Sequence, residues 1–103
     1  MFAHALFALM LAAQTETDQT VEVKKGVRLE VHNFAGDVIV KVWNRDAVHI
    51  EAEHSDRETV DIRPSDVALI IRGRSRNGPQ RSIDYTLTVP AWMPISIDGT
   101  NAD

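Results

Sequence analysis

Apolar and polar residues alternate with a period of two through most of the chain after Val21. The segment 29–40 shows this most clearly, because Leu29 and Val31 alternate with polar neighbours and the alternation resumes at Val38 after a polar break. Such alternation is typical of strands with one buried face, and the apolar positions are mostly β-branched, which favours strands. The pattern predicts strands at 21–24, 28–33, 38–43, 48–53, 60–63, 67–72, 82–89 and 95–97.

Polar or proline-containing breaks separate these strands. We expect a corner around Gly36, and a second one at 90–94, because proline cannot continue a central ladder. Ser55 and Glu58 match a helix capping box, but alternation resumes directly after them, so a polar turn is expected there. Ile70 makes its strand apolar on both faces, which favours a central position in a sheet. The chain therefore predicts an all-β fold, either a β-sandwich or roll or the start of a β-solenoid.

The N-terminus has a different composition. Residues 1–13 carry no acidic side chain, no lysine and no arginine, and an apolar run ends at Ala13 before a polar segment. This run has the length of a signal-peptide core and is too short to span a membrane. We predict a signal-peptide helix at 1–13, a polar linker at 14–20 and a β-strand-repeat domain at 21–103 that is truncated at its C-terminus. The expected location is the periplasm or the cell surface. The alternative is an apolar helix packed on the domain.

Composition excludes several kinds of function. The chain has 103 residues, no cysteine and a net charge of −4. One domain is expected, with no disulfide and no thiolate chemistry. The negative charge gives no reason to expect nucleic acid as a partner. Nucleophile, phosphate-binding, dinucleotide and zinc-protease motifs do not occur, so the sequence predicts neither an enzyme nor a cofactor. An envelope component or another protein is the expected partner.

Two groups of side chains are candidates for binding. Four arginines fall within ten residues, and arginine clusters bind phosphate or acidic polysaccharide; they are Arg72, Arg74, Arg76 and Arg81. Trp43 and Trp92, together with Tyr85, offer flat apolar faces for a sugar ring. The alternatives are a solvated hairpin loop for the arginines, and a buried Tyr85 with tryptophans that cover sheet edges or corners.

A row of metal-binding residue types follows one predicted strand. His49, Glu51 and Glu53 share the face opposite the apolar residues, and His32 on another strand could add a ligand for a divalent cation. The favoured interpretation is a solvated strand face whose mixed charges discourage edge pairing, because a metal site usually needs three or four converging ligands and the sequence shows no convergence.

Three stretches carry a resemblance to a known family. They are RLEVHNFAGDVIVKVW at 28–43, DAVHIEAEHS at 46–55 and IDYTLTVPAWMPISIDGTN at 83–101. Together they resemble the N-terminal part of the DUF4097 family of bacterial β-strand-repeat proteins, sometimes labelled putative adhesins or head-GIN-like. The resemblance implies an exported or membrane-attached protein whose strands continue into solenoid rungs after 95–99, so this chain is expected to be a fragment. It implies no catalytic residues.

Two functions are therefore expected. The first is an exported, non-enzymatic β-repeat module with a structural, adhesive or cell-envelope role. The alternative is a binding module for an anionic envelope polymer or glycan that uses the 72–81 loop with Trp43 or Trp92.

Overall fold

The computed structural model describes residues 16–33, 35–76, 78 and 82–98. The segment 1–13, expected to be a signal-peptide helix, lies outside the described residues. The described residues form eight strands and no helix, which confirms the all-β prediction. They are β1 (Glu16–Glu22), β2 (Arg28–His32), β3 (Val38–Trp43), β4 (Ala47–Glu53), β5 (Glu58–Pro64), β6 (Ala68–Ser75), β7 (Asp84–Pro90) and β8 (Ile95–Asp98).

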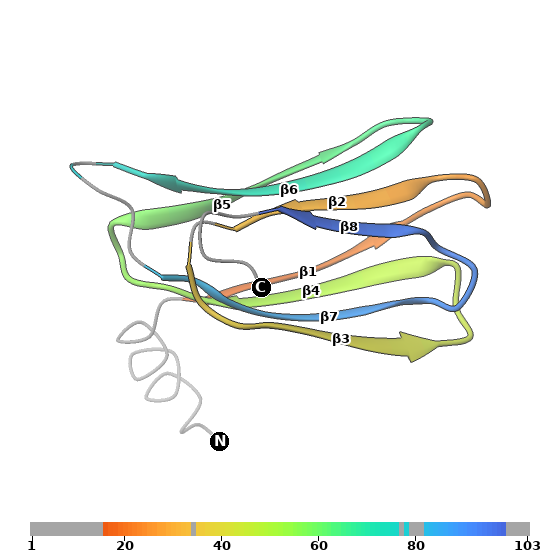
Figure 1. Cartoon of the computed structure of the whole chain (residues 1–103), viewed down its shortest axis with the longest axis horizontal. Coiled ribbons are helices and arrows are strands. Elements are labelled where there is room, and N and C mark those ends of the chain that lie inside the picture. Colours follow the sequence, from red (N-terminus) through yellow and green to blue (C-terminus); the bar gives the residue numbers. More distant parts are fainter. Residues whose placement is uncertain (1–15, 34, 77, 79–81, 99–103) are drawn as a thin grey trace, which may run out of the picture.

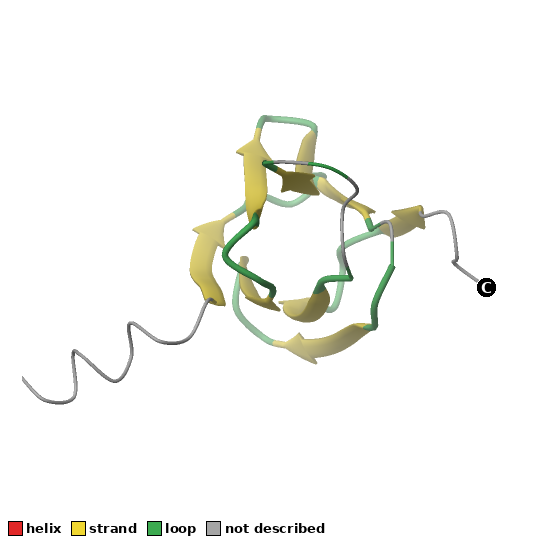
Figure 2. Ribbon diagram, turned by 90° about the vertical axis from the view of Figure 1, so that its left-hand side faces the viewer, coloured by secondary structure: helices red, strands yellow, loops and turns green. Residues whose placement is uncertain are grey.

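The strands form two mixed sheets that face each other (Figure 1). Sheet 1 has the order β1-β4-β7-β3, and sheet 2 has the order β5-β6-β2-β8. The β2–β6, β2–β8 and β3–β7 pairs are parallel, and the β1–β4, β4–β7 and β5–β6 pairs are antiparallel. Seen along the strands in Figure 2, the two sheets curve around one interior. The sequence left open a β-sandwich or roll and the start of a β-solenoid. The described residues form two facing sheets.

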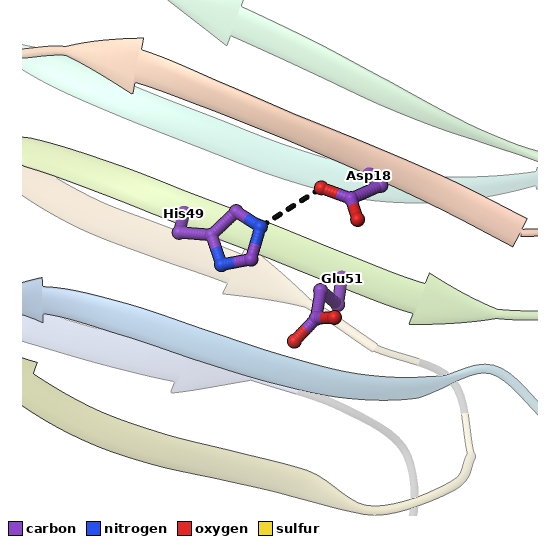
Figure 3. Close-up of side chains that lie close together, drawn as sticks. All are labelled: Asp18, His49 and Glu51. Atoms are coloured by element: carbon purple, nitrogen blue, oxygen red, sulfur yellow. Dashed lines mark hydrogen bonds and ion pairs between the residues drawn. The ribbon is translucent and has the colours of Figure 1, made fainter.

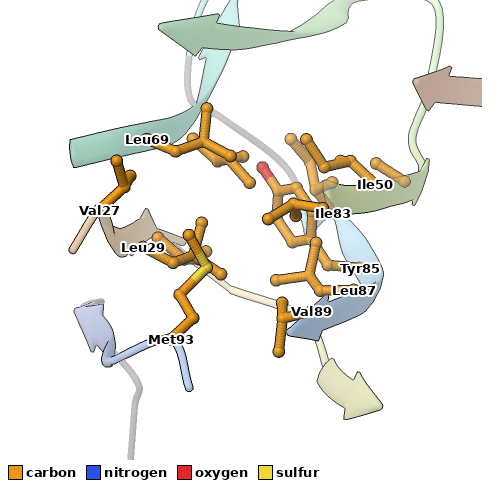
Figure 4. Packing of buried hydrophobic residues seen from close by; sticks show 13 residues of the cluster. Val27, Leu29, Ile50, Leu69, Ile83, Tyr85, Leu87, Val89 and Met93 are labelled. Atoms are coloured by element: carbon orange, nitrogen blue, oxygen red, sulfur yellow. The ribbon is translucent and has the colours of Figure 1, made fainter. Parts of the chain in front are cut away.

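The core lies between the sheets and comes mainly from the inner strands β2, β6, β4 and β7 (Figure 4). On β7, for example, Tyr85, Leu87 and Val89 are buried while the residues between them face outward. The cluster also contains Val27, Leu29, Val31, Val48, Ile50, Ala52, Leu69, Ile71, Ile83 and Met93. Each fully buried aliphatic side chain of this kind contributes about 1.5–3 kcal/mol. The two-residue alternation therefore identified the inward face of these strands.

Gly36 forms the expected corner, where the chain crosses from β2 in sheet 2 to β3 in sheet 1. Its φ is +110°, a conformation that L side chains rarely adopt. The corner is tied to the start of β7: Ile83 N donates to Ala35 O at 3.0 Å and Tyr85 N donates to Asp37 O at 2.8 Å. A Cβ on Gly36 would lie well inside contact distance of the Ile83 carbonyl.

Three local features differ in detail from the sequence expectations. Residues 16–20, expected within a polar linker, form most of β1. Their backbone pairs with β4, and the strand was not expected because these residues have no apolar face to bury. The strand expected at 67–72 begins one residue later, at Ala68, and Val67 is exposed. The capping-box pair does form without a helix: Ser55 Oγ donates to Glu58 Oε1 at 2.7 Å and so helps satisfy a buried carboxylate.

Candidate functional site

The outward face of sheet 1 carries a group of three side chains of metal-binding type. Strand register puts Asp18 on β1 directly opposite Glu51 on β4, and His49 lies two residues before Glu51 on the same face. One ligand atom from each of these three side chains lies within 4.8 Å of the other two (Figure 3). We call Asp18, His49 and Glu51 the β1–β4 cluster.

His49 is held from two sides. Its Nε2 lies 2.8 Å from Asp18 Oδ1. Its ring is stacked on Trp43, with centroids 6.3 Å apart and an interplanar angle of 27°. Trp43 is itself anchored, because its Nε1 donates to Ala47 O at 2.8 Å and the Arg45 guanidinium covers its ring at 4.6 Å. The imidazole is therefore oriented toward Asp18 by contacts that do not involve Glu51.

A shallow cleft of about 280 Å³ lies beside the β1–β4 cluster. Five of its lining residues carry a carboxyl group, namely Glu16, Asp37, Glu51, Glu53 and Asp84. Among the described residues, Asp84 accepts a hydrogen bond from Asp37 N at 2.9 Å, whereas no ion pair or hydrogen bond reaches the Glu51 carboxylate. This end of sheet 1 is therefore strongly acidic, and its acids are poorly neutralised.

Sheet 2 offers an instructive contrast on its own outward face. Arg28 Nε donates to Glu30 Oε2 at 2.8 Å, and this hydrogen bond lowers the pKa of Glu30. His32 lies 3.6 Å from both the Glu30 and the Asp98 carboxylates. The sequence placed His32 as a fourth ligand for the histidine and acids of β4, but it lies on the other sheet. On sheet 2, therefore, the positive charge of Arg28 already neutralises the Glu30 carboxylate.

Sequence reasoning missed Asp18 as a member of the cluster. The segment 16–22 offered little signal, because Val21 is its one apolar residue and no polar/apolar alternation marks it as a strand. Only the pairing of β1 with β4 places Asp18 beside His49 and Glu51, and an isolated strand pattern does not reveal its neighbour.

The arginines of the expected anion site follow the C-terminal half of β6. Arg72, Arg74 and Arg76 are exposed, and Arg81 lies outside the described residues. Arg74 is already paired, with its Nε 3.3 Å from Asp61 Oδ2, and Arg63 shares the same carboxylate at 3.0 Å.

Each of the two tryptophans is anchored to a residue of the β3–β4 turn. Trp92 Nε1 donates to Asp46 Oδ1 at 2.9 Å, and Trp43 Nε1 donates to Ala47 O. Trp43 lies at the end of β3, at the edge of the sandwich where β6 begins, whereas the arginines lie toward the end of β6 (Figure 1). Both tryptophans therefore bond to the β3–β4 turn, and the structure does not bring Arg72, Arg74 or Arg76 to them. Binding of an anionic polymer by these residues stays a prediction.

One side of the sandwich is less well covered than the other. β1 and β5 lie beside each other, which leaves β3 and β8 on the opposite side, each with a single strand neighbour among the described residues. Their inward-facing side chains remain accessible: Val40 is 36% exposed, Val42 63%, Ile95 38% and Ile97 41%. We call β3 and β8 with these four side chains the open edge.

Comparisons with known proteins identify no relative. No protein-family model, no curated protein and no solved structure matches this chain. The resemblance to the DUF4097 family therefore stays a prediction. In the described ranges, no helix has the length and apolar character needed to cross a membrane.

Proposed function

We propose that this chain is an exported, non-enzymatic β-module with a structural or adhesive role in the cell envelope, and that copies of it associate through the open edge. The observation that carries the proposal is the exposure of inward-facing valines and isoleucines along β3 and β8, which have no outer strand neighbour within the part of the chain that the structure describes. The apolar leader and the resemblance to exported β-repeat proteins support the envelope location.

A further strand at this edge would be favourable for two reasons. It would pair backbone N–H and C=O groups on the outer sides of β3 and β8, where no described strand lies, and edges of this kind are templates for strand addition. It would also cover Val42, Ile95 and Ile97, with a gain of about 25 cal/mol for each Å² of apolar surface buried. Natural edge strands are usually protected by inward charges, prolines or bulges, whereas β3 carries apolar side chains at every inward position.

A second copy of this chain fits the open edge because each copy carries a lysine on β3 and an aspartate on β8, whose charges are complementary. Lys41 on β3 and Asp98 on β8 both face outward, opposite in direction to Val40 and Ile97. If β3 of one copy pairs with β8 of the other, these opposite charges come together on the outer face while the apolar side chains meet on the inner face. Two such contacts, related by a twofold axis, give a closed dimer.

The association is tested by measuring mass in solution with the full chain over a concentration series. We expect wild type to dimerise, and Val42→Lys or Ile97→Lys to weaken the dimer at least about tenfold, because a lysine would be buried in the contact. Val67→Lys is the matched control, since Val67 is 62% exposed, like Val42 at 63%, but lies in the β5–β6 turn. A wild type that stays monomeric throughout, or equal dimerisation of all variants, would contradict the proposal.

Export is tested separately by fractionating cells that produce the chain with a C-terminal tag. We expect the processed protein, shortened by the 1–13 segment, outside the cytosol. Intact protein with its leader in the cytosol would overturn the envelope location without bearing on association through the open edge.

A further inference from the structure

We propose that the β1–β4 cluster is a binding site for a divalent transition-metal ion of the Zn²⁺ type, held by Asp18, His49 and Glu51. The site is on the outward face of sheet 1, and its three ligands come from β1 and β4 rather than from the strands of the open edge.

The donor set suits such an ion. One imidazole nitrogen and two carboxylate oxygens are ligands that Zn²⁺ accepts at about 2.0–2.2 Å, whereas Mg²⁺ and Ca²⁺ prefer oxygen alone. Ligand atoms around a four-coordinate Zn²⁺ lie about 3–3.5 Å apart. The three atoms already lie within 4.8 Å of one another, so a small rotation of the exposed Asp18 and half-buried Glu51 side chains would close the site. Three protein ligands leave a further position open toward the acidic cleft.

The arrangement of the ligands is supported by their surroundings. His49 is oriented by the stacked Trp43 ring, which is itself held by Ala47 O and Arg45. The imidazole of His49 is therefore already oriented, and an oriented side chain loses less conformational entropy when it binds a metal ion. Asp18 and Glu51 come from paired strands in direct register, so the backbone sets their separation.

The electrostatics also favour a cation at this position. Asp18 and Glu51 are like charges directly opposite each other on paired strands, an arrangement that destabilises a sheet. Glu16 on β1, Glu53 on β4, and Asp37 and Asp84 at the starts of β3 and β7 add negative charge at the same end of the face. Among the described strands of sheet 1, this face carries one lysine, Lys41 on β3. The Glu51 carboxylate has no hydrogen-bond or ion-pair partner among the described residues. A bound divalent ion would offset this repulsion.

The test is titration of the untagged full chain with Zn²⁺, followed by calorimetry, and with Co²⁺, followed by its visible absorption. We expect one ion per chain and a ligand-field spectrum that includes a nitrogen ligand. Asp18→Asn and His49→Ala should each weaken binding at least about tenfold, since even outer-shell substitutions cost 10–100-fold. A large excess of Mg²⁺ should not displace the ion.

His32→Ala is the matched control, because His32 also lies near two carboxylates but outside the cluster. It should bind Zn²⁺ like wild type, and circular dichroism should show that all variants keep the fold. The proposal fails if wild type shows no saturable binding, if His32→Ala loses as much affinity as His49→Ala, or if Asp18→Asn and His49→Ala both bind as wild type does.

Discussion

Gly36→Ala is expected to lower the free energy of unfolding by about 3 kcal/mol, which combines backbone strain at positive φ with overpacking. The added Cβ would press on the Ile83 carbonyl and approach the Asp84 side chain at 2.9 Å. Both neighbours lie at the start of β7, which is hydrogen-bonded to the corner that joins β2, in one sheet, to β3, in the other. The corner cannot relax without loosening the Ile83–Ala35 and Tyr85–Asp37 hydrogen bonds. Denaturant unfolding followed by circular dichroism measures the loss.

Gly26→Ala separates the two causes. Gly26 also has a positive φ, +101°, but a Cβ there would have nothing within 4 Å. Its substitution should therefore cost about 1 kcal/mol, the low end of the range for strain alone. Equal losses at Gly26 and Gly36 would show that the close approach to Ile83 does not matter.

Tyr85 is expected to make the protein sensitive to alkali. Its side chain is buried in the core, and its hydroxyl has no hydrogen-bond partner among the described residues. Burial raises the pKa of Tyr85 from 10.0 to about 12, because the phenolate would lose its hydration. The folded protein then keeps the proton after the unfolded chain has released it, so stability falls as pH rises from 10 to about 12. The loss should be on the order of 2 kcal/mol.

This expectation can be measured directly because the chain has one tyrosine. The phenolate absorbance of the folded protein should titrate near pH 12 rather than 10, and unfolding curves across this range should show the loss. Tyr85→Phe removes the titrating group and an unpaired buried hydroxyl. It should abolish the tyrosine-linked part of the alkaline loss and leave stability near neutral pH unchanged or higher by about 1 kcal/mol. An ordinary titration midpoint in the folded state would contradict the prediction.

Much of the fold could be predicted because it depends on local physics. Alternation with a period of two predicted the strands β2 to β8 and the inward face of most of them, for instance Leu87 and Val89 inward and Thr88 outward on β7. It did not place β1, most of which lies in the expected linker. The apolar character of Ile70 correctly indicated a central strand, since β6 lies between β5 and β2. Gly36 was recognisable as a corner because a glycine among polar residues between two strands is a turn signal.

The candidate site was predicted less well. His49 and Glu51 were identified as a potential ligand pair because they share a face of one strand. The sequence grouped Glu53 and His32 with this pair on spacing and composition. In the structure, the third member of the cluster beside His49 and Glu51 is Asp18. Strand alternation states which face a side chain occupies, but it carries no information on the strand that lies alongside.

The sequence by itself determined that the protein is built of short, half-buried strands, where they turn, and which side chains face inward. Only the tertiary structure decided which strands are neighbours: that β1 pairs with β4, that β2 lies in parallel between β6 and β8, and that β3 and β8 end their sheets. The physical reason is that a central strand and an edge strand satisfy the same periodicity. Their difference lies in hydrogen bonds and contacts made across long separations in the chain. The proximity of Asp18 to His49 and the exposure of Val42 both depend on those long-range pairings.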